Sequence, residues 1–303
     1  MSFFFSRRTY NASKNRFTNN VAEVTRYLAL QGDGPENGKW RGSMMEQVDW
    51  CRAVHQDARS NEITIFVHGF NTPQTSMLTR RAKIESGLRK HGYGGAVVAF
   101  DWPSDGSALR YSRDKSDAKK AARHLVSDCI LPLLAEAPKP TINLIGHSMG
   151  CYVTLRALSE FDDTDAFRLN QICFVSADVH RSWMGKGAWG SLILAHRAKR
   201  FTNYFSQLDG TLNLPALLVN SFEKRVGRWG MPPLIAKNHV DIYSHEQFLK
   251  DVPHKEQTPT YSHTWWFDND KFYQDLAMTL AGHDAHSMPT RRRMNTTDLA
   301  LLS

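Results

Sequence analysis

The stretch Thr141-Ile-Asn-Leu-Ile-Gly-His-Ser-Met-Gly150 places a serine between two glycines, directly after five residues with strand character. The run from Cys151 to Phe161 that follows it has helical periodicity. A G-x-S-x-G pentapeptide between a strand and a helix is typical of a nucleophile elbow, a tight and strained turn that exposes the serine hydroxyl. The two glycines let the strand and the helix approach closely. We therefore predict that Ser148 is a nucleophile; an ordinary turn with a capping serine is the alternative.

Short apolar runs alternate with longer segments of helical period from residue 61 onward. Thr72 and Pro73 favour a helix start after the first of these runs, and a last helix is predicted from the caps at 268–270 to Gly282. The alternation predicts an α/β fold with a mainly parallel central sheet and helices on both of its faces. The predicted strands are 63–67, 96–100, 141–145, 171–175, 215–219 and, more weakly, 240–243.

The two ends of the chain have less regular patterns. Residues 3–5 and 24–28 favour leading antiparallel strands, and residues 44–58 favour a helix. Near the other end, Arg291-Arg-Arg293 stands among polar residues with little periodic apolar content. We therefore predict one large domain over residues 1–283, followed by a loose basic tail over 284–303.

The composition is that of an ordinary globular protein, with 41% hydrophobic and 22% charged residues, which excludes disordered, collagenous and fibrous classes. A formal net charge of +8 predicts solvated basic faces, and no nucleic-acid partner is expected. The cysteines form no C-x-x-C pair, and no apolar run approaches the length of a membrane span. Metal-binding and phosphate-binding motifs are also missing from the sequence. We expect a cytoplasmic protein that needs neither a metal nor an organic cofactor.

Residues 180–214 mix aromatic and basic side chains without obvious strand character. The segment is too long for a simple connection between strands, so we predict a lid-like insertion above the sheet edge. Such a lid could touch an acyl chain or make weak contact with an anionic membrane surface. A helical excursion that is buried on its own domain is the alternative.

A serine nucleophile of this kind requires backbone N–H groups that bind the developing oxyanion. One donor is the residue after the serine, Met149, and the other comes from the loop after an earlier strand. That loop is His68-Gly-Phe-Asn71, in which the N–H of Phe70 is our candidate. The residues predicted to line or shape the adjacent pocket are His68, Asn71, Trp102 and His147.

These motifs together resemble a family of bacterial serine α/β-hydrolases whose substrates are largely uncharacterised. The resemblance covers residues 2–282 and includes His68-Gly-Phe-Asn71, Asp101-Trp-Pro-Ser104, Tyr111 with Asp114, the elbow pentapeptide and Ser262-His263. It implies the α/β-hydrolase fold and a triad in the chain order serine, acid, histidine. It does not imply a substrate.

The catalytic base must follow the acid in the chain, which leaves several downstream histidines. His263 precedes the aromatic run 265–267 and the capped last helix, so it is expected on a loop after the last strand. It also matches the position where the resembled family has a histidine followed by aromatic residues. His245, directly after the weaker strand, is the second candidate.

Two carboxylates follow predicted strands and could orient the imidazole: Asp178, after the strand at 171–175, and Glu223, after the strand at 215–219. The resembled family has aspartate at both places, so this chain departs from the family at Glu223. A glutamate can serve as a triad acid with a longer reach. Both alternatives stay open.

We expect a serine hydrolase that cleaves a carboxylic ester or thioester through an acyl-enzyme, with a small-molecule ester or acyl compound as its substrate. A lipase, an amidase or an acyltransferase could use the same triad. A non-catalytic binding protein that contacts an anionic membrane or a nucleic acid through its basic segments is the alternative from another class. The oligomeric state does not follow from the sequence.

Overall fold

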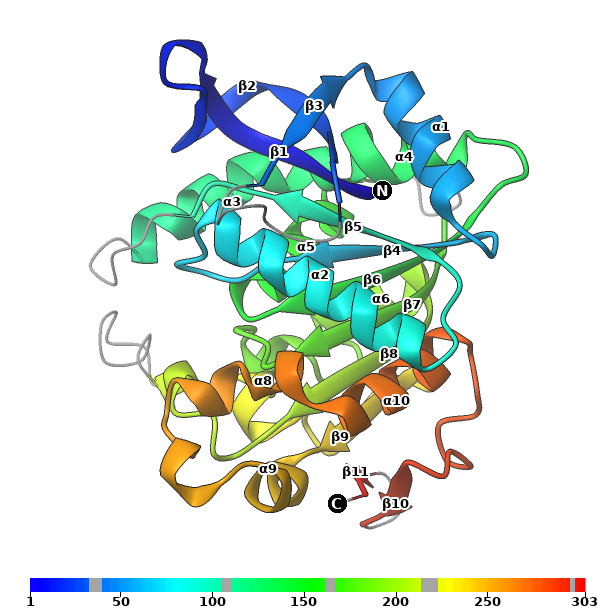
Figure 1. Cartoon of the computed structure of the whole chain (residues 1–303). Helices are drawn as coiled ribbons and strands as arrows, with labels where there is room; N and C mark the ends of the chain where they lie inside the picture. Colours follow the sequence, from blue (N-terminus) through cyan, green and yellow to red (C-terminus); the bar gives the residue numbers. More distant parts are fainter. Residues whose placement is uncertain (33–39, 105–110, 162–166, 214–222, 295–297, 303) are drawn as a thin grey trace.

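A computed structural model describes residues 1–32, 40–104, 111–161, 167–213, 223–294 and 298–302 (Figure 1). Its strands form one mixed sheet, parallel in the centre, with the order β10-β11-β9-β8-β7-β6-β4-β5-β1-β2-β3. All neighbours from β9 to β1 pair in parallel, whereas both edges end in antiparallel hairpins. The strands are β1 (Ser2–Asn11), β2 (Arg16–Leu30), β3 (Gly42–Met45), β4 (Glu62–Val67), β5 (Ala96–Asp101), β6 (Thr141–His147), β7 (Leu169–Val175), β8 (Ala198–Phe205), β9 (His239–Tyr243), β10 (Arg291–Arg293) and β11 (Leu299–Leu301).

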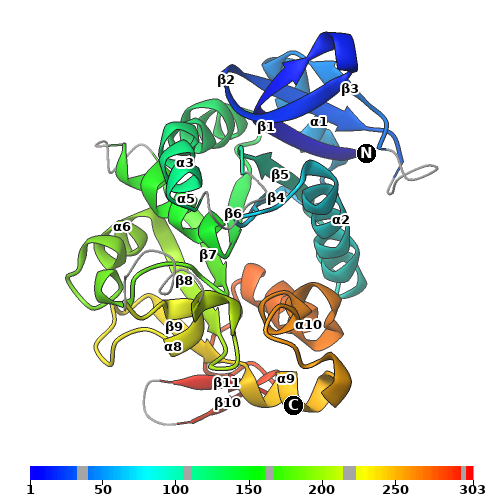
Figure 2. The same ribbon diagram turned by 90° about the vertical axis from the view of Figure 1, so that its left-hand side faces the viewer.

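Helices cover both faces of the sheet, as predicted. The helices are α1 (Gln47–Asp57), α2 (Gln74–Lys90), α3 (Tyr111–Leu125), α4 (Leu131–Leu134), α5 (Met149–Ser159), α6 (Trp189–Arg197), α8 (Val226–Trp229), α9 (His245–Asp251) and α10 (Asp270–Leu280). Helices α1, α3, α4, α5 and α6 contribute buried side chains to the core on one face, and α2, α9 and α10 to the core on the other (Figure 2).

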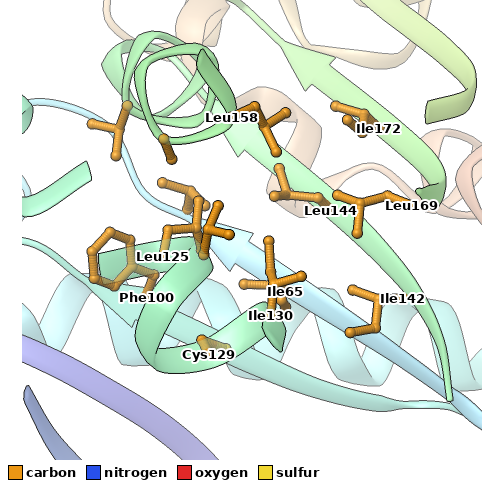
Figure 3. Close-up of a cluster of buried hydrophobic side chains, with 14 of the residues drawn as sticks. Ile65, Phe100, Leu125, Cys129, Ile130, Ile142, Leu144, Leu158, Leu169 and Ile172 are labelled. Carbon is orange, nitrogen blue, oxygen red and sulfur yellow. The ribbon is translucent and has the colours of Figure 1, made fainter. Parts of the chain in front are cut away.

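The two cores follow from the alternation of side chains along each strand. Consecutive residues of a strand point to opposite faces of the sheet, so Ile65 of β4 joins the first core and Phe66 joins the second. Figure 3 shows the first core, where Ile65 and Leu144 from adjacent strands lie beneath Leu158 of α5. Because the parallel strands are buried on both faces, they read as continuous apolar runs in the sequence.

The predicted strands at 63–67, 96–100, 141–145, 171–175 and 240–243 are confirmed as β4, β5, β6, β7 and β9. The two leading antiparallel strands are also confirmed, as the longer β1 and β2. The helix predicted at 44–58 begins later, because residues 42–45 form the edge strand β3. The strand predicted at 215–219 lies outside the described residues.

The prediction of a lid-like insertion at 180–214 is wrong. Residues 198–205 form β8, a parallel strand between β7 and β9, and α6 packs beside α5 on the sheet. Lys199 and Arg200 obscure this strand in the sequence. The guanidinium of Arg200 donates from Nε to Gln171 Oε1 at 2.9 Å and from Nη2 to the Thr279 carbonyl oxygen at 2.7 Å. The aromatic rings of Phe201 and Tyr204 are buried, so they cannot contact a membrane surface.

The prediction of a loose tail over 284–303 is also wrong where the structure describes it. Residues 291–293 and 299–301 pair with each other, and β11 extends the sheet beside β9. Arg291 is buried and donates from Nε to Asp275 Oδ1 at 2.8 Å and from Nη2 to Asp275 Oδ2 at 2.7 Å. This two-point ion pair holds the tail against α10.

Candidate active site

Ser148 lies between the end of β6 and the first residue of α5, in a backbone conformation that L-residues rarely adopt. Its φ is 55° and its ψ is −124°. The turn is held by the Ser148 N–H, which donates to the Val175 carbonyl at 3.1 Å, and by the Asp178 N–H, which donates to the Ser148 carbonyl at 3.1 Å. Such a strained conformation persists only where the surroundings enforce it.

The two glycines of the pentapeptide are required by close packing around this turn. A Cβ atom at Gly150 would lie 2.2 Å from the Val67 carbonyl oxygen of the neighbouring strand, which is impossible without a backbone shift. At Gly146 it would lie 3.1 Å from the Cα atom of Cys151 in the first turn of α5. The sequence pattern therefore forms the predicted elbow, with strand and helix in direct contact.

His263 lies in a short 3-10 helix, Tyr261–His263, between α9 and α10. Its Nδ1 atom lies 2.8 Å from Asp209 Oδ2, and the Asp209 side chain is fully buried. A carboxylate oxygen can only accept, so this contact fixes the proton on Nδ1 in the neutral ring and leaves Nε2 able to accept a proton. Asp209 follows β8 and accepts from the Leu212 N–H at 3.3 Å through its other carboxylate oxygen.

His147, the residue before the elbow serine, supports the His263 loop. Its Nε2 donates to the His263 carbonyl oxygen at 2.9 Å, and the centroids of the two rings are 4.7 Å apart. Burial, the neighbouring His263 and Arg80 all hold the pKa of His147 well below its usual value. The ring is therefore neutral at physiological pH, with its proton on Nε2.

The loop after β4 passes directly against the serine. A Cβ atom at Gly69 would lie 2.8 Å from the Ser148 Cβ atom, so only glycine fits. His68 Nδ1 donates to the Gly69 carbonyl oxygen at 2.9 Å. Because that carbonyl and the Phe70 N–H belong to one planar trans peptide, this bond also fixes the direction of the Phe70 N–H. The Met149 N–H is at the N-terminus of α5, where helix N–H groups lack partners within the helix.

A buried charge cluster lies behind this loop. Asp101, at the end of β5, accepts from Arg8 Nε at 2.7 Å, from Ser6 Oγ at 2.8 Å and from Gln74 Nε2 at 2.7 Å. His68 Nε2 faces the same carboxylate at 3.6 Å. Burial alone would raise the pKa of Asp101, but Arg8 and His68 outweigh it and hold the pKa well below its usual range. The carboxylate is therefore ionised and anchors β1, β5 and the loop together.

A family of proteins described as "Alpha/beta hydrolase of unknown function (DUF900)" matches residues 44–235, which is more than half of the 303-residue chain. The chain belongs to this alpha/beta hydrolase family. An uncharacterized protein of Nostoc sp. (alr1448) is 28% identical over 120 residues, which are 32% of this chain and 31% of that protein. The chain thus matches less than a third of the length of this relative.

Solved structures resemble the chain only distantly. A cutinase-like protein from Cryptococcus sp. has a TM-score of 0.36 at 15% identity, over 73% of this chain and 92% of its own. An esterase/lipase from an uncultured bacterium has a TM-score of 0.33 at 11% identity, over 84% of this chain and 71% of its own. Among the residues that the structure describes, no helix combines the length and the apolar character of a membrane span.

The carboxylate that meets His263 is Asp209, so the prediction of Asp178 or Glu223 in this position needs correction. Asp178 is buried near the elbow, but its Oδ1 accepts from Arg225 Nε at 2.7 Å. The Glu223 side chain is 53% exposed, and its Oε2 lies 3.8 Å from His180 Nδ1. The second histidine candidate, His245, stacks on Tyr243 at the start of α9.

Two of the residues predicted to line the pocket next to the elbow are buried inside the protein. The His68 and Trp102 rings are fully buried and stacked 5.2 Å apart, and Trp102 Nε1 donates to the His68 carbonyl at 2.8 Å. His147 is also buried, and it supports the His263 loop from inside the protein. Asn71 is exposed, with a φ of 48°. These residues therefore shape the loop, and of the four only Asn71 can meet a ligand directly.

Proposed function

We propose that the protein is a serine hydrolase that cleaves a carboxylic ester or thioester through Ser148, His263 and Asp209. The observation that carries the proposal is the 2.8 Å contact between His263 Nδ1 and the buried Asp209. It gives the histidine the tautomer that a general base requires, on a loop that is tied to the elbow through His147. The strained elbow, the buried acid and the oriented histidine follow each other in the chain in the order expected for this fold.

In the first half of the reaction the Ser148 hydroxyl oxygen forms a bond to the acyl carbon. His263 Nε2 takes the hydroxyl proton, and the carbonyl π-electrons move to the oxygen. The N–H groups of Met149 and Phe70 donate to this oxyanion. When the tetrahedral intermediate collapses, the bond to the alkoxide or thiolate breaks and His263 returns the proton to that leaving group.

In the second half a water molecule repeats these steps on the acyl-enzyme. His263 removes a proton from the water, whose oxygen bonds to the acyl carbon, and then returns a proton to Ser148 as the carboxylic acid leaves. Asp209 stays ionised and stabilises the imidazolium that forms twice in each cycle. Amidase, lipase and acyltransferase chemistry use the same groups and differ in the leaving group, the acyl chain and the final acceptor.

Labelling with a fluorophosphonate tests this proposal, because the probe requires an activated serine and no knowledge of the substrate. The wild type should label, Ser148→Ala and His263→Ala should not, and the exposed Glu223→Gln should label like the wild type. Folding of each variant is checked by circular dichroism. A folded wild type that does not label would contradict the proposal and favour a binding protein built on a hydrolase fold.

A further inference from the structure

A pocket of about 410 Å³ lies on the face of the sheet that carries α3, α5 and α6, three helices that Figure 2 shows on the same side of the sheet. Its described lining consists of three aromatic and two basic side chains: Lys119, Tyr152, Arg156, Trp183 and Trp189. No acidic side chain belongs to this lining as far as the structure describes it. This volume falls within the range of small-molecule sites.

The aromatic side chains that line the pocket pack against one another. The Trp183 and Trp189 rings meet edge to face with centroids 5.3 Å apart, and Tyr152 and Trp183 are 6.2 Å apart. His180 stacks on Trp183 at 4.3 Å and supports it from outside the lining. Rings in such arrangements present both faces and edges, which suits binding of a planar aromatic group.

The lining also contains two cations, Lys119 and Arg156. Lys119 is exposed on α3. Arg156 of α5 lies over the Trp189 ring, 5.9 Å from its centroid, and is 4.0 Å from Glu160. A planar group in the pocket therefore lies near positive charge.

The pocket is tied to the nucleophile through two short stretches of chain. Tyr152 is in the first turns of α5, and helical side chains lean toward the helix N-terminus, which here is Ser148. On the other side the Asp178 N–H binds the Ser148 carbonyl, and the chain continues from there to the short 3-10 helix Arg181–Trp183. Tyr152 thus follows Ser148 within the first turns of α5, and Trp183 lies in the short helix that follows Asp178.

We infer that this pocket binds one arm of the substrate, and that this arm is an aromatic ring with a negatively charged substituent at its far end. The substrate class is therefore an anionic aryl ester, with the ring against Tyr152, Trp183 and Trp189 and its charge near Lys119 and Arg156. The inference rests on the proposed serine chemistry, because it assigns the specificity of that same site.

Two fluorophosphonates that differ only in a sulfonate at the far end of an aryl arm test the inference. In each reaction the Ser148 oxygen bonds to phosphorus, fluoride leaves with the P–F electron pair, and the proton passes to His263. The rate constant for inactivation is divided by the rate of spontaneous hydrolysis, which removes electronic differences between the probes. A small alkyl fluorophosphonate measures the reactivity of the serine itself.

The wild type should prefer the sulfonated probe by about 5-fold or more at low salt, and the preference should shrink as salt screens the charges. Lys119→Glu should abolish it, while the neighbouring Lys120→Glu, which makes the same charge change outside the pocket, should retain most of it. Trp183→Ala should slow both aryl probes about 10-fold without affecting the alkyl probe, unlike the exposed control Trp229→Ala.

Failure of the two proposals can be told apart. If the alkyl probe labels Ser148 but the wild type shows no preference for the sulfonated probe, or if Lys119→Glu and Lys120→Glu behave alike, the inference is overturned and the hydrolase proposal stands. If no probe labels the folded wild type, both fall together.

Discussion

Asp209 Oδ2 lies 2.8 Å from His263 Nδ1, although 54 residues separate them in the chain. The contact joins the loop after β8 to the short helix before α10. Because parallel strands deliver their carboxyl ends to one edge of the sheet, the Ser148 turn after β6 and the Phe70 loop after β4 reach that same edge. The contact between Asp209 and His263 therefore lies at the same edge of the sheet as these two loops.

Asp209→Asn should leave the fold intact and lower kcat by about 10⁴-fold, because an amide can hold His263 in the wrong tautomer. The measurement is the rate of ester hydrolysis, or of fluorophosphonate labelling where no ester is turned over. Glu223→Gln, which removes the exposed carboxylate that the sequence also suggests as a triad acid, should keep full activity. Equal losses in the two variants would contradict the assignment of Asp209.

Much of the site could be predicted from local sequence because its parts are local. The elbow needs only a strand, two glycines and a helix in succession, and His263 is marked by the aromatic run and helix cap that follow it. Asp209 could not be found in this way because β8 begins Ala-Lys-Arg, which hides its strand character. The run Phe201-Thr-Asn-Tyr-Phe205, rich in β-branched and aromatic residues, was the available signal.

The sequence therefore points to carboxylates that follow other strands, Asp178 and Glu223, as partners of His263. Asp178 does follow β7, but its carboxylate pairs with Arg225. The two residues are 47 positions apart in the chain, so this tertiary contact cannot be read from local sequence. The tail was mispredicted for a similar reason. In the sequence Arg291 resembles part of a solvated basic run, and its ion pair with the buried Asp275 on α10 explains why it is buried instead.

Gly69→Ala should lower activity far more than stability. The new Cβ atom would meet the Ser148 Cβ atom at 2.8 Å, so the loop must shift away from the serine and carry the Phe70 N–H with it. Loss of one oxyanion donor costs about 10²- to 10³-fold in kcat. Gly92→Ala, at a φ of 83° with open space around it, is the control: it should lose about 1 kcal/mol of stability and no activity. Comparable activity in both variants would argue against the role of the loop.

The buried pair Arg291–Asp275 should contribute strongly to stability. Its side chains are 1% and 0% exposed, and removal of one partner leaves the other charge buried and unpaired, which costs about 3–5 kcal/mol. Arg291→Ala should therefore lower the free energy of unfolding in urea by that amount. Arg292→Ala breaks the exposed pair with Glu246 and should cost less than about 1 kcal/mol. Similar effects of the two substitutions would show that the tail does not depend on this contact.

His147 should make the protein sensitive to acid. Its pKa is well below the unfolded value of 6.5 in the folded protein, so the unfolded chain binds one more proton than the folded chain between these two pKa values. Its contribution to stability is therefore fully present above pH 6.5 and is lost as the pH falls, at up to about 1.4 kcal/mol per pH unit.

His147→Gln removes this titration and can still donate to the His263 carbonyl. The variant should show a shallower loss of stability between pH 6.5 and 5 than the wild type, by up to one bound proton. Urea titrations at several pH values measure the slope. Parallel curves for the two proteins would mean that His147 is not held neutral by the fold.

The most direct test of the account is to locate the covalent adduct. The wild type is treated with a fluorophosphonate, digested, and its peptides are analysed by tandem mass spectrometry. We predict a single phosphonylated residue, Ser148, and its loss when His263 is replaced by alanine. An adduct on another residue, or none on the folded protein, would contradict the proposal that the elbow serine is the nucleophile.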